Sequence, residues 1–306
     1  MSDVALRESR RGTVYGALAY LLWGLFPLYW PLLAPAGAFE VLAHRVLWSL
    51  VVVVVLLRLT RGWSAVGDVV RDRGRLAKLT AAAVLVGVNW GTYIYGVTSD
   101  HVVETSLGYF VNPLVSVLLG VVVLGERLRP AQKFAVGAAL VAVVVLSLEN
   151  GRPPWIALVL AFTFGFYGLL KKQAGVAAVP ALAVETAVLA PVAALFLAGL
   201  GLTGRATFTG HGLAHPLLLA LAGVVTAVPL LAFAGAANRV PLSTLGVLQY
   251  IAPTLQFLLG VLLFHEPLGL ARLLGFCLVW LALVVFTADL LGERRRQTRR
   301  PVLAPA

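Results

Sequence analysis

Charged residues and cysteine are both scarce in this chain of 306 residues. Asp, Glu, Lys and Arg together make up 12% of it, whereas 60% is hydrophobic, and the mean hydropathy is +0.93. A soluble protein of this length needs more polar residues to cover its surface, so the composition excludes a soluble globular fold. The single cysteine, Cys277, can form no intrachain disulfide.

Motifs of enzymes and of metal sites are also missing from the sequence. There is no HExxH and no cluster of Cys and His with the spacing of metal ligands. Gly120 and Gly125 have the spacing of a phosphate-binding loop, but Glu126-Arg127 follows where Lys and Ser or Thr are needed. We therefore predict no enzyme activity, no cofactor and no metal. Any transport would draw its energy from an ion gradient or from exchange.

What the chain does have is a series of ten apolar stretches. A membrane-spanning helix needs about 20 mostly apolar residues. The first stretch follows Arg7, Arg10 and Arg11, as in a signal peptide, but its apolar run is too long for one, so we expect an uncleaved anchor. The predicted fold class is an all-α polytopic membrane protein with ten transmembrane helices. The predicted spans are 13–32, 39–57, 77–98, 103–124, 131–148, 154–170, 180–200, 216–236, 242–264 and 271–290.

Positive charge is distributed unevenly between alternate loops. Of the 24 Lys and Arg residues, 20 lie in the two termini and in the loops after the second, fourth, sixth and eighth spans. The other loops hold only Arg152, Arg205 and Arg272. Because Lys and Arg accumulate on the cytoplasmic side, both termini are predicted to be cytoplasmic. The net charge of +11 is then explained by topology and by contacts with anionic lipid headgroups, without nucleic acid as a partner.

The two halves of the chain repeat each other. At a shift of 140 residues, Pro113 aligns with Pro253 and Glu126 with Glu266. The repeat contains five spans, and because five is odd, the second copy must enter the membrane from the opposite side. Inverted repeats are common in secondary transporters, which bind substrate near the midplane between the halves. We predict one five-helix repeat at 12–148, a second, inverted one at 153–290, and a basic cytoplasmic tail at 291–306.

Several of these stretches are similar to one family of permeases. They are LLWGLFPLYW at 21–30, EVLAHR at 40–45, SLGYFVNPL at 106–114, LG at 119–120 with GERL at 125–128, and QYIAPT at 249–254 within 245–256. The chain resembles the RarD-like permeases in the EamA-type branch of the drug/metabolite transporter superfamily, over residues 12–290. The resemblance implies two five-helix repeats, a bacterial inner membrane and a small-molecule substrate, and the family is named for chloramphenicol sensitivity. The sequence His265-Glu266-Pro267 departs from the first-half Gly-Glu-Arg, which weakens a common role for the two glutamates.

The repeat and the resemblance together predict a secondary-active permease. It would move a small organic metabolite or an amphipathic drug by alternating access, in the direction of export or exchange. Import of a metabolite is an open alternative, and so is a membrane receptor or scaffold that does not transport. Protons as the coupling ion and a homodimer are likewise left open.

Ionisable residues inside the spans are the first candidates for function, because a central Arg in a bilayer costs about 2.5–3.5 kcal/mol. Arg45 is the only basic residue well inside a span, and Glu185 is the only acid. Arg45 would bind an anionic or polar substrate group, or else extend to the headgroups. Glu185 is a candidate for proton coupling, or else a carboxylate near the interface. His44 is a candidate proton relay, or else a hydrogen-bonded link between helices.

Polar and aromatic residues gather in the first, third, fourth and ninth spans. Such groups line small-molecule cavities, although they also join helices by hydrogen bonds. Pro113 and Pro253 are candidate hinges or static kinks. We expect Trp30, Trp48 and Trp155, near span ends, to anchor at the membrane interfaces. The predicted cavity residues are Trp23, His44, Arg45, Asn89, Trp90, Tyr93, Tyr109, Asn112, Gln249, Tyr250 and Gln256.

Overall fold

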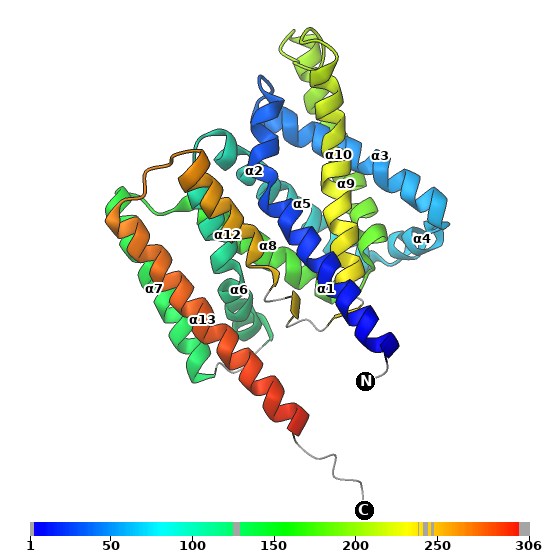
Figure 1. The fold of residues 1–306 in the computed structure, drawn as a ribbon. Coiled ribbons are helices and arrows are strands. Elements are labelled where there is room, and N and C mark those ends of the chain that lie inside the picture. The colour runs from blue at the N-terminus through cyan, green and yellow to red at the C-terminus, as the bar shows by residue number, and fades with distance from the viewer. Residues whose placement is uncertain (1–2, 125–128, 238, 241–243, 246–247, 300–306) are drawn as a thin grey trace, which may run out of the picture.

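A computed structural model describes residues 3–124, 129–237, 239–240, 244–245 and 248–299, and each element in these ranges is a helix (Figure 1). The first half contains α1 (Asp3–Gly24), α2 (Phe26–Tyr29), the 3-10 helix η1 (Trp30–Leu33), α3 (Ala38–Thr60), α4 (Trp63–Arg71), α5 (Arg73–Thr98), α6 (Val102–Leu124) and α7 (Pro130–Asn150). The second half contains α8 (Trp155–Ala174), α9 (Ala178–Leu202), α10 (Ala214–Ala237), α12 (Ile251–Leu258), the π-helix η2 (Leu259–Leu263) and α13 (Leu270–Arg299).

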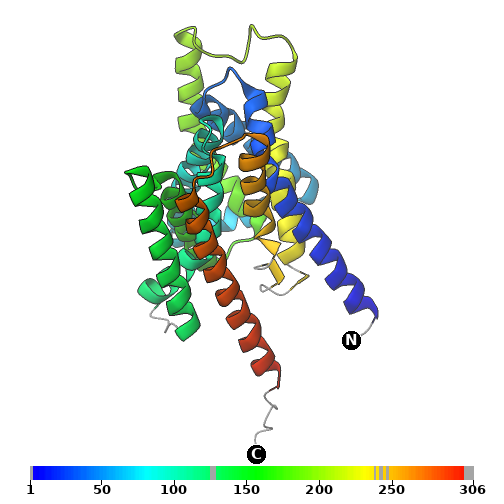
Figure 2. The ribbon, with the colours of Figure 1, turned by 60° about the vertical axis from the view of Figure 1, so that its left-hand side comes forward.

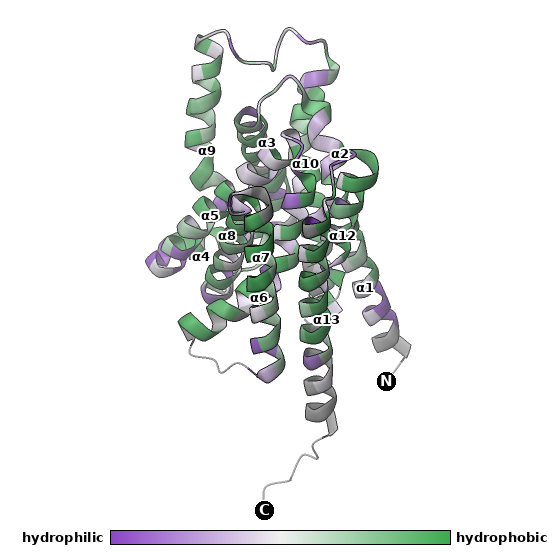
Figure 3. Cartoon of the chain, turned by 90° about the vertical axis from the view of Figure 1, so that its left-hand side faces the viewer, coloured by the Kyte–Doolittle hydropathy of each residue, from purple (hydrophilic) through white to green (hydrophobic). Residues whose placement is uncertain are grey.

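Most of these helices are long and apolar. Within the described ranges, six of them can cross a bilayer by length and hydropathy: α3, α6, α7, α9, α10 and α13. The segment from α1 through η1 forms a seventh candidate, bent by 42° between Gly24 and Phe26. Apolar residues cover these helices along most of their length, whereas α4 and the start of α1 carry hydrophilic residues (Figure 3). The chain is therefore a multi-pass α-helical membrane protein.

Three of the ten predicted spans do not meet the same criterion. Residues 77–98 fall in α5, a helix of 26 residues whose apolar character is lowered by Asn89, Trp90 and Tyr93. Residues 154–170 fall in α8, whose apolar part is short, and 242–264 contains α12 and η2, which are also short together. Residues 241–243 and 246–247 lie outside the described part of the chain. Ten spans therefore stays a prediction.

Helices of the first half pack mainly on helices of the second half. The pairs α7–α13, α3–α9 and α6–α12 are each in contact, and Figures 1 and 2 both show α7 beside α13. The other extensive contacts between the halves come in matched pairs: α1–α10 with α5–α8, α6–α8 with α1–α12, and α3–α10 with α5–α9. When the helices of one half are exchanged for the equivalent helices of the other, each of these extensive contacts becomes its partner in the pair, whereas smaller contacts such as α6–α13 have no such partner in the described part of the chain.

Two glycines allow helices of the two halves to approach closely. A Cβ on Gly108 of α6 would lie 2.8 Å from the carbonyl oxygen of Ala157 in α8. A Cβ on Gly24 of α1 would lie 2.8 Å from the side chain of Leu255 in α12. Small residues permit the van der Waals packing that associates helices in a bilayer. Gly108 therefore permits the α6–α8 contact and Gly24 permits the α1–α12 contact, which is the equivalent contact in the repeat.

The start of α1 and the end of α13 lie at the same end of the molecule, and the connection between α9 and α10 lies at the other end (Figures 1 and 2). This is the arrangement expected of a chain whose termini share one side of the membrane.

Candidate functional site

Arg45 lies inside the helix assembly, where α3 meets α10 and α5. Its side chain is 3% exposed, and its Nε donates a hydrogen bond to Oγ1 of Thr226 at 2.9 Å. The guanidinium carbon lies 4.0 Å from the ring centroid of Trp90, 5.1 Å from that of Trp30 and 5.7 Å from that of Phe26. Desolvated cation–π contacts contribute roughly 0.5–2 kcal/mol. The aromatic rings and Thr226 thus hold Arg45 within the protein.

The Arg45 charge has no acidic partner among the described residues. Its Nη1 forms no hydrogen bond there, and neither does Nε1 of Trp30, which is 1% exposed. A buried polar group left unpaired costs about 1–3 kcal/mol. The hydroxyls of Tyr29, Tyr93 and Tyr109 lie near enough to interact with the Arg45 charge. The surroundings of Arg45 therefore contain two buried N–H donors without acceptors.

Trp30 is not the interface anchor that its place near a span end predicts. Its ring packs against Phe26 at 5.3 Å and Tyr29 at 5.0 Å between centroids, and it reaches Arg45. The chain bends after Gly24, and α2 and η1 turn this segment inward. Pro27, at the start of α2, is the feature of the sequence that indicates this bend. Phe26, Trp30 and Thr226 are the contacts of Arg45 that the sequence prediction missed.

Asn89 joins three helices. Its Nδ2 donates to the carbonyl oxygen of Leu160 at 3.0 Å and to Oγ1 of Thr163 at 2.9 Å, both in α8. The hydroxyl of Tyr109 in α6 donates to Asn89 Oδ1 at 3.2 Å, and the Tyr109 ring packs 5.6 Å from that of Tyr93. Both amide hydrogens of Asn89 are used in these contacts. The side chain therefore acts as an interhelical link, the alternative that the sequence left open.

Gln256 and Trp23 extend the same polar region toward α1 and α12. The Gln256 side chain is 2% exposed, and its Nε2 donates to the Trp23 carbonyl oxygen at 3.2 Å. It also approaches the hydroxyl of Tyr93. The Trp23 ring packs 5.3 Å from Tyr20 and 5.8 Å from Phe233 of α10. Of the predicted cavity residues, the structure brings together Trp23, Arg45, Asn89, Trp90, Tyr93, Tyr109 and Gln256.

The other predicted residues lie in different surroundings. His44 stacks on Phe208 of the α9–α10 connection with centroids 4.9 Å apart, because neighbouring helix positions point about 100° apart. Asn112 accepts a hydrogen bond from Ser116 at 3.3 Å within α6. Tyr250, with Gln249 and Thr287 near its hydroxyl, packs against the apolar cluster of α6, α7 and α13.

Glu185 is buried in α9 with its partners from α8. Lys171 Nζ lies 2.8 Å from Glu185 Oε1, and the Tyr167 hydroxyl donates to Oε2 at 3.2 Å. The side chain is 1% exposed, so the ion pair is largely inside the protein. The apolar run predicts a span that ends at residue 170 and leaves Lys171 in the following loop, but α8 continues to Ala174. Glu185 therefore pairs within the second half and not with Arg45.

The two prolines related by the repeat occupy different positions in their helices. Pro113 lies in the interior of α6, where it removes a backbone hydrogen bond. Pro253 lies in the first turn of α12, which begins at Ile251, so its missing N–H breaks no helical bond. Of the two, only Pro113 weakens a continuous helix, and a hinge at either stays a prediction.

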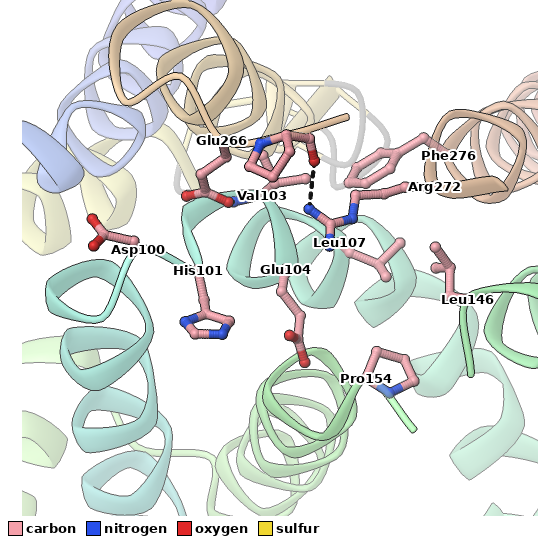
Figure 4. Close-up of a pocket in the computed structure, with 11 residues that line it drawn as sticks. Asp100, His101, Val103, Glu104, Leu107, Leu146, Pro154, Glu266, Arg272 and Phe276 are labelled. Carbon is pink, nitrogen blue, oxygen red and sulfur yellow. Dashed lines mark hydrogen bonds between the residues drawn. The ribbon is translucent and has the colours of Figure 1, made fainter. Parts of the chain in front are cut away.

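A cavity of about 220 Å³ lies apart from these residues, where α6, α8 and the segment before α13 meet. Its lining includes Asp100, His101, Glu104, Glu266 and Arg272, and none of the predicted cavity residues (Figure 4). Glu104 Oε1 accepts a hydrogen bond from the backbone N–H of Ile156 at 3.0 Å. The repeat singles out Glu266 and the loop charges single out Arg272, but the sequence gives no signal that brings these side chains to Asp100, His101 and Glu104.

Comparison with known proteins agrees with this architecture. The EamA-like transporter family matches residues 10–148 and again 153–288. Protein RarD of Streptomyces exfoliatus is 54% identical, with 97% of this chain and 94% of that protein covered. Uncharacterized transporter YojE of Bacillus subtilis is 41% identical (92% and 94% covered), and Chloramphenicol-sensitive protein RarD of Pseudomonas aeruginosa is 32% identical (97% and 100% covered).

A solved structure of 22% identity shares the fold, with a TM-score of 0.59 over 92% of this chain and 98% of that one. Both halves match the family, and relatives of high identity extend over nearly the whole sequence. The chain is therefore a member of the EamA-like transporter family, and it is RarD-like.

Proposed function

We propose that this protein is a secondary-active permease of a bacterial inner membrane. It moves a small organic metabolite or an amphipathic drug by alternating access, in the direction of export or exchange. Family membership supports transport, and relatives from Bacillus subtilis and Vibrio cholerae are named as uncharacterized transporters. The name of the Pseudomonas aeruginosa relative makes chloramphenicol one compound to test.

The proposed architecture is ten spans in two inverted five-helix repeats, 12–148 and 153–290. The separate match of the family to each half supports it. The matched helix contacts also support it, because a two-fold axis in the membrane plane would produce each contact together with its counterpart. Both termini, including the basic tail at 291–306, are then cytoplasmic, as the distribution of Lys and Arg indicates.

The observation that carries the proposal is the buried guanidinium of Arg45 between the halves. Helices α3 and α5 of the first half and α10 of the second contribute to its surroundings through Trp90 and Thr226. Transporters with inverted repeats bind substrate at such an interface. The cavity in this proposal is lined by Arg45, Trp90, Tyr93, Tyr109, Gln256 and Trp23.

Proton coupling is assigned in this proposal to Glu185, with His44 as a relay. The Glu185–Lys171 pair supports the assignment, because a carboxylate with a displaceable cationic partner can exchange a proton for that partner. Protonation would release Lys171 toward its cytoplasmic side and break its ionic link from α8 to α9.

Flux through purified protein tests the proposal. Proteoliposomes would be loaded with amino acids, organic acids and amphenicols in turn, with and without an imposed pH gradient. Saturable movement of one compound, faster with the gradient, is the expected result. If the folded protein moves no compound in either direction, the receptor or scaffold alternative replaces the permease.

A further inference from the structure

Arg45 carries a buried positive charge that the protein itself leaves uncompensated. The acids on neighbouring elements are engaged elsewhere: Glu185 with Lys171, and Glu40 with the backbone N–H of Thr207 at 2.7 Å. A buried charge is retained in proteins when it is paired or hydrogen-bonded. Cation–π contacts supply part of the compensation at most. The missing partner must therefore come from outside the described side chains.

The orientation of the guanidinium is set from the α10 side. The Thr226 hydroxyl donates its proton to the Ala222 carbonyl oxygen at 2.8 Å, so its lone pair faces Nε of Arg45 at 2.9 Å. With Nε occupied, Nη1 is the buried donor that lacks an acceptor. Trp30 presents a second such donor, Nε1, from η1. Both donors belong to the contact between the Arg45 guanidinium and the Trp30 ring, and unpaired buried donors favour a ligand that is rich in acceptors.

We propose that the transported molecule carries a carboxylate, which binds to Arg45 with the Trp30 indole N–H as a second donor. This inference rests on the proposed transport function. The planar fork of a guanidinium matches the two oxygens of a carboxylate, which an ammonium cannot do. The Trp90 ring adjoins the guanidinium, and this ring together with the packed pair Tyr93 and Tyr109 accommodates the apolar body of the molecule.

Trp90 controls access to the guanidinium. Its ring lies nearest to Arg45, at 4.0 Å, and its side chain is only half-buried, whereas Arg45 is 3% exposed. Rotation of this one indole would remove the ring nearest to the guanidinium and leave the contact of Phe26 with Trp30 in place. A carboxylate then replaces the Trp90 ring face as the partner of the charge.

Matched pairs of compounds separate the carboxylate from the rest of a ligand. The probes are lactate, succinate, benzoate, phenylacetate and indole-3-acetate, each beside its primary amide. Binding is followed by tryptophan fluorescence of the purified protein, and flux is followed in proteoliposomes. At least one carboxylate should bind tenfold or more tightly than its amide, and it should show saturable flux.

Variants of Arg45 tie this preference to the guanidinium. Arg45→Gln should abolish the preference, and Arg45→Lys, which keeps the charge without the fork, should weaken carboxylate binding at least tenfold. Thr226→Val keeps the Arg45 charge but removes the hydrogen bond that orients the guanidinium, so a smaller loss of carboxylate binding is expected. This variant tests the inference if Arg45→Gln does not fold. Arg239→Gln, at a partly exposed Arg paired with Glu8 at 3.0 Å, is the matched control and should change nothing.

Three results would overturn the inference. They are equal binding of carboxylates and amides, an unchanged preference in folded Arg45→Gln, and no binding by any carboxylate of the series. In each case saturable flux of a neutral compound would leave the permease standing. Absence of all flux would instead overturn the permease itself.

Discussion

The carboxylate of Glu266 caps α6 from the other half of the chain. It accepts a hydrogen bond from the backbone N–H of Val103 at 3.0 Å, across 163 positions, and one from Val102. A carboxylate at a helix N-terminus is stabilised by the unpaired N–H groups and by the helix dipole. His265, at φ +53°, turns the chain so that Glu266 reaches this position beside Val103 (Figure 4). The two halves are thus joined by a titratable group outside the spans.

The first prediction concerns the pH dependence of stability at Glu266. Burial raises the pKa of this carboxyl above its usual 4.5, and the N–H groups of Val103 and Val102 oppose the shift. Because the folded-state pKa lies above the unfolded one, the contribution of Glu266 to stability falls as pH rises from 4.5 through the raised pKa. The side chain in Glu266→Gln is uncharged at every pH, so the melting temperature of this variant should depend less on pH in this window.

Glu104→Gln is the control for this measurement, because Glu104 also accepts a backbone hydrogen bond at the start of a helix, from Ile156. An equal flattening in Glu104→Gln, or none in Glu266→Gln, would contradict the assignment to Glu266.

The second prediction concerns the close contact of α6 with α8. Gly108→Val would place side-chain atoms against the backbone of Ala157, 2.8 Å from its carbonyl oxygen at Cβ alone. Overpacking of this kind costs about 1–3 kcal/mol, so the melting temperature should fall by several degrees. Gly137→Ala in α7, where an added Cβ meets nothing within 4 Å, should leave it unchanged or higher. Equal melting temperatures of the two variants would show that α6 and α8 are farther apart than described.

The third prediction separates the structural from the coupling role of Glu185. Lys171→Gln leaves the buried Glu185 carboxylate without its cation, which should lower the free energy of unfolding by about 3 kcal/mol. This value is at the lower end for buried ion pairs because Lys171 is partly exposed. The double variant with Glu185→Gln should recover most of that loss in a thermal melt. Glu185→Gln alone should bind substrate normally yet lose the response of flux to a pH gradient. A retained response would make Glu185 purely structural.

The fourth prediction concerns topology. In a Cys277→Ser background, Gly37→Cys and Thr209→Cys should react with an impermeant maleimide added outside intact cells, since both positions are exposed. Arg71→Cys, also exposed, should react only after the cells are opened. The reverse pattern would invert the proposed orientation.

Local features of the sequence predicted the helices, because apolar runs of span length and the distribution of Lys and Arg act without regard to distant partners. Contacts between remote segments were not predictable in this way. Trp30 reaches Arg45 only because the chain bends after Gly24. Lys171 reaches Glu185 because α8 continues past its apolar run. Glu266 meets α6 through tertiary packing alone.

Accessibility of position 226 tests alternating access most directly. Thr226→Cys in the Cys277→Ser background places a thiol beside Arg45, at a site that is 1% exposed in this conformation. A small anionic methanethiosulfonate reagent would be applied separately to each face of oriented vesicles. Alternating access predicts reaction from either face, slowed by a transported compound. Reaction from one face only, or from neither, would contradict it.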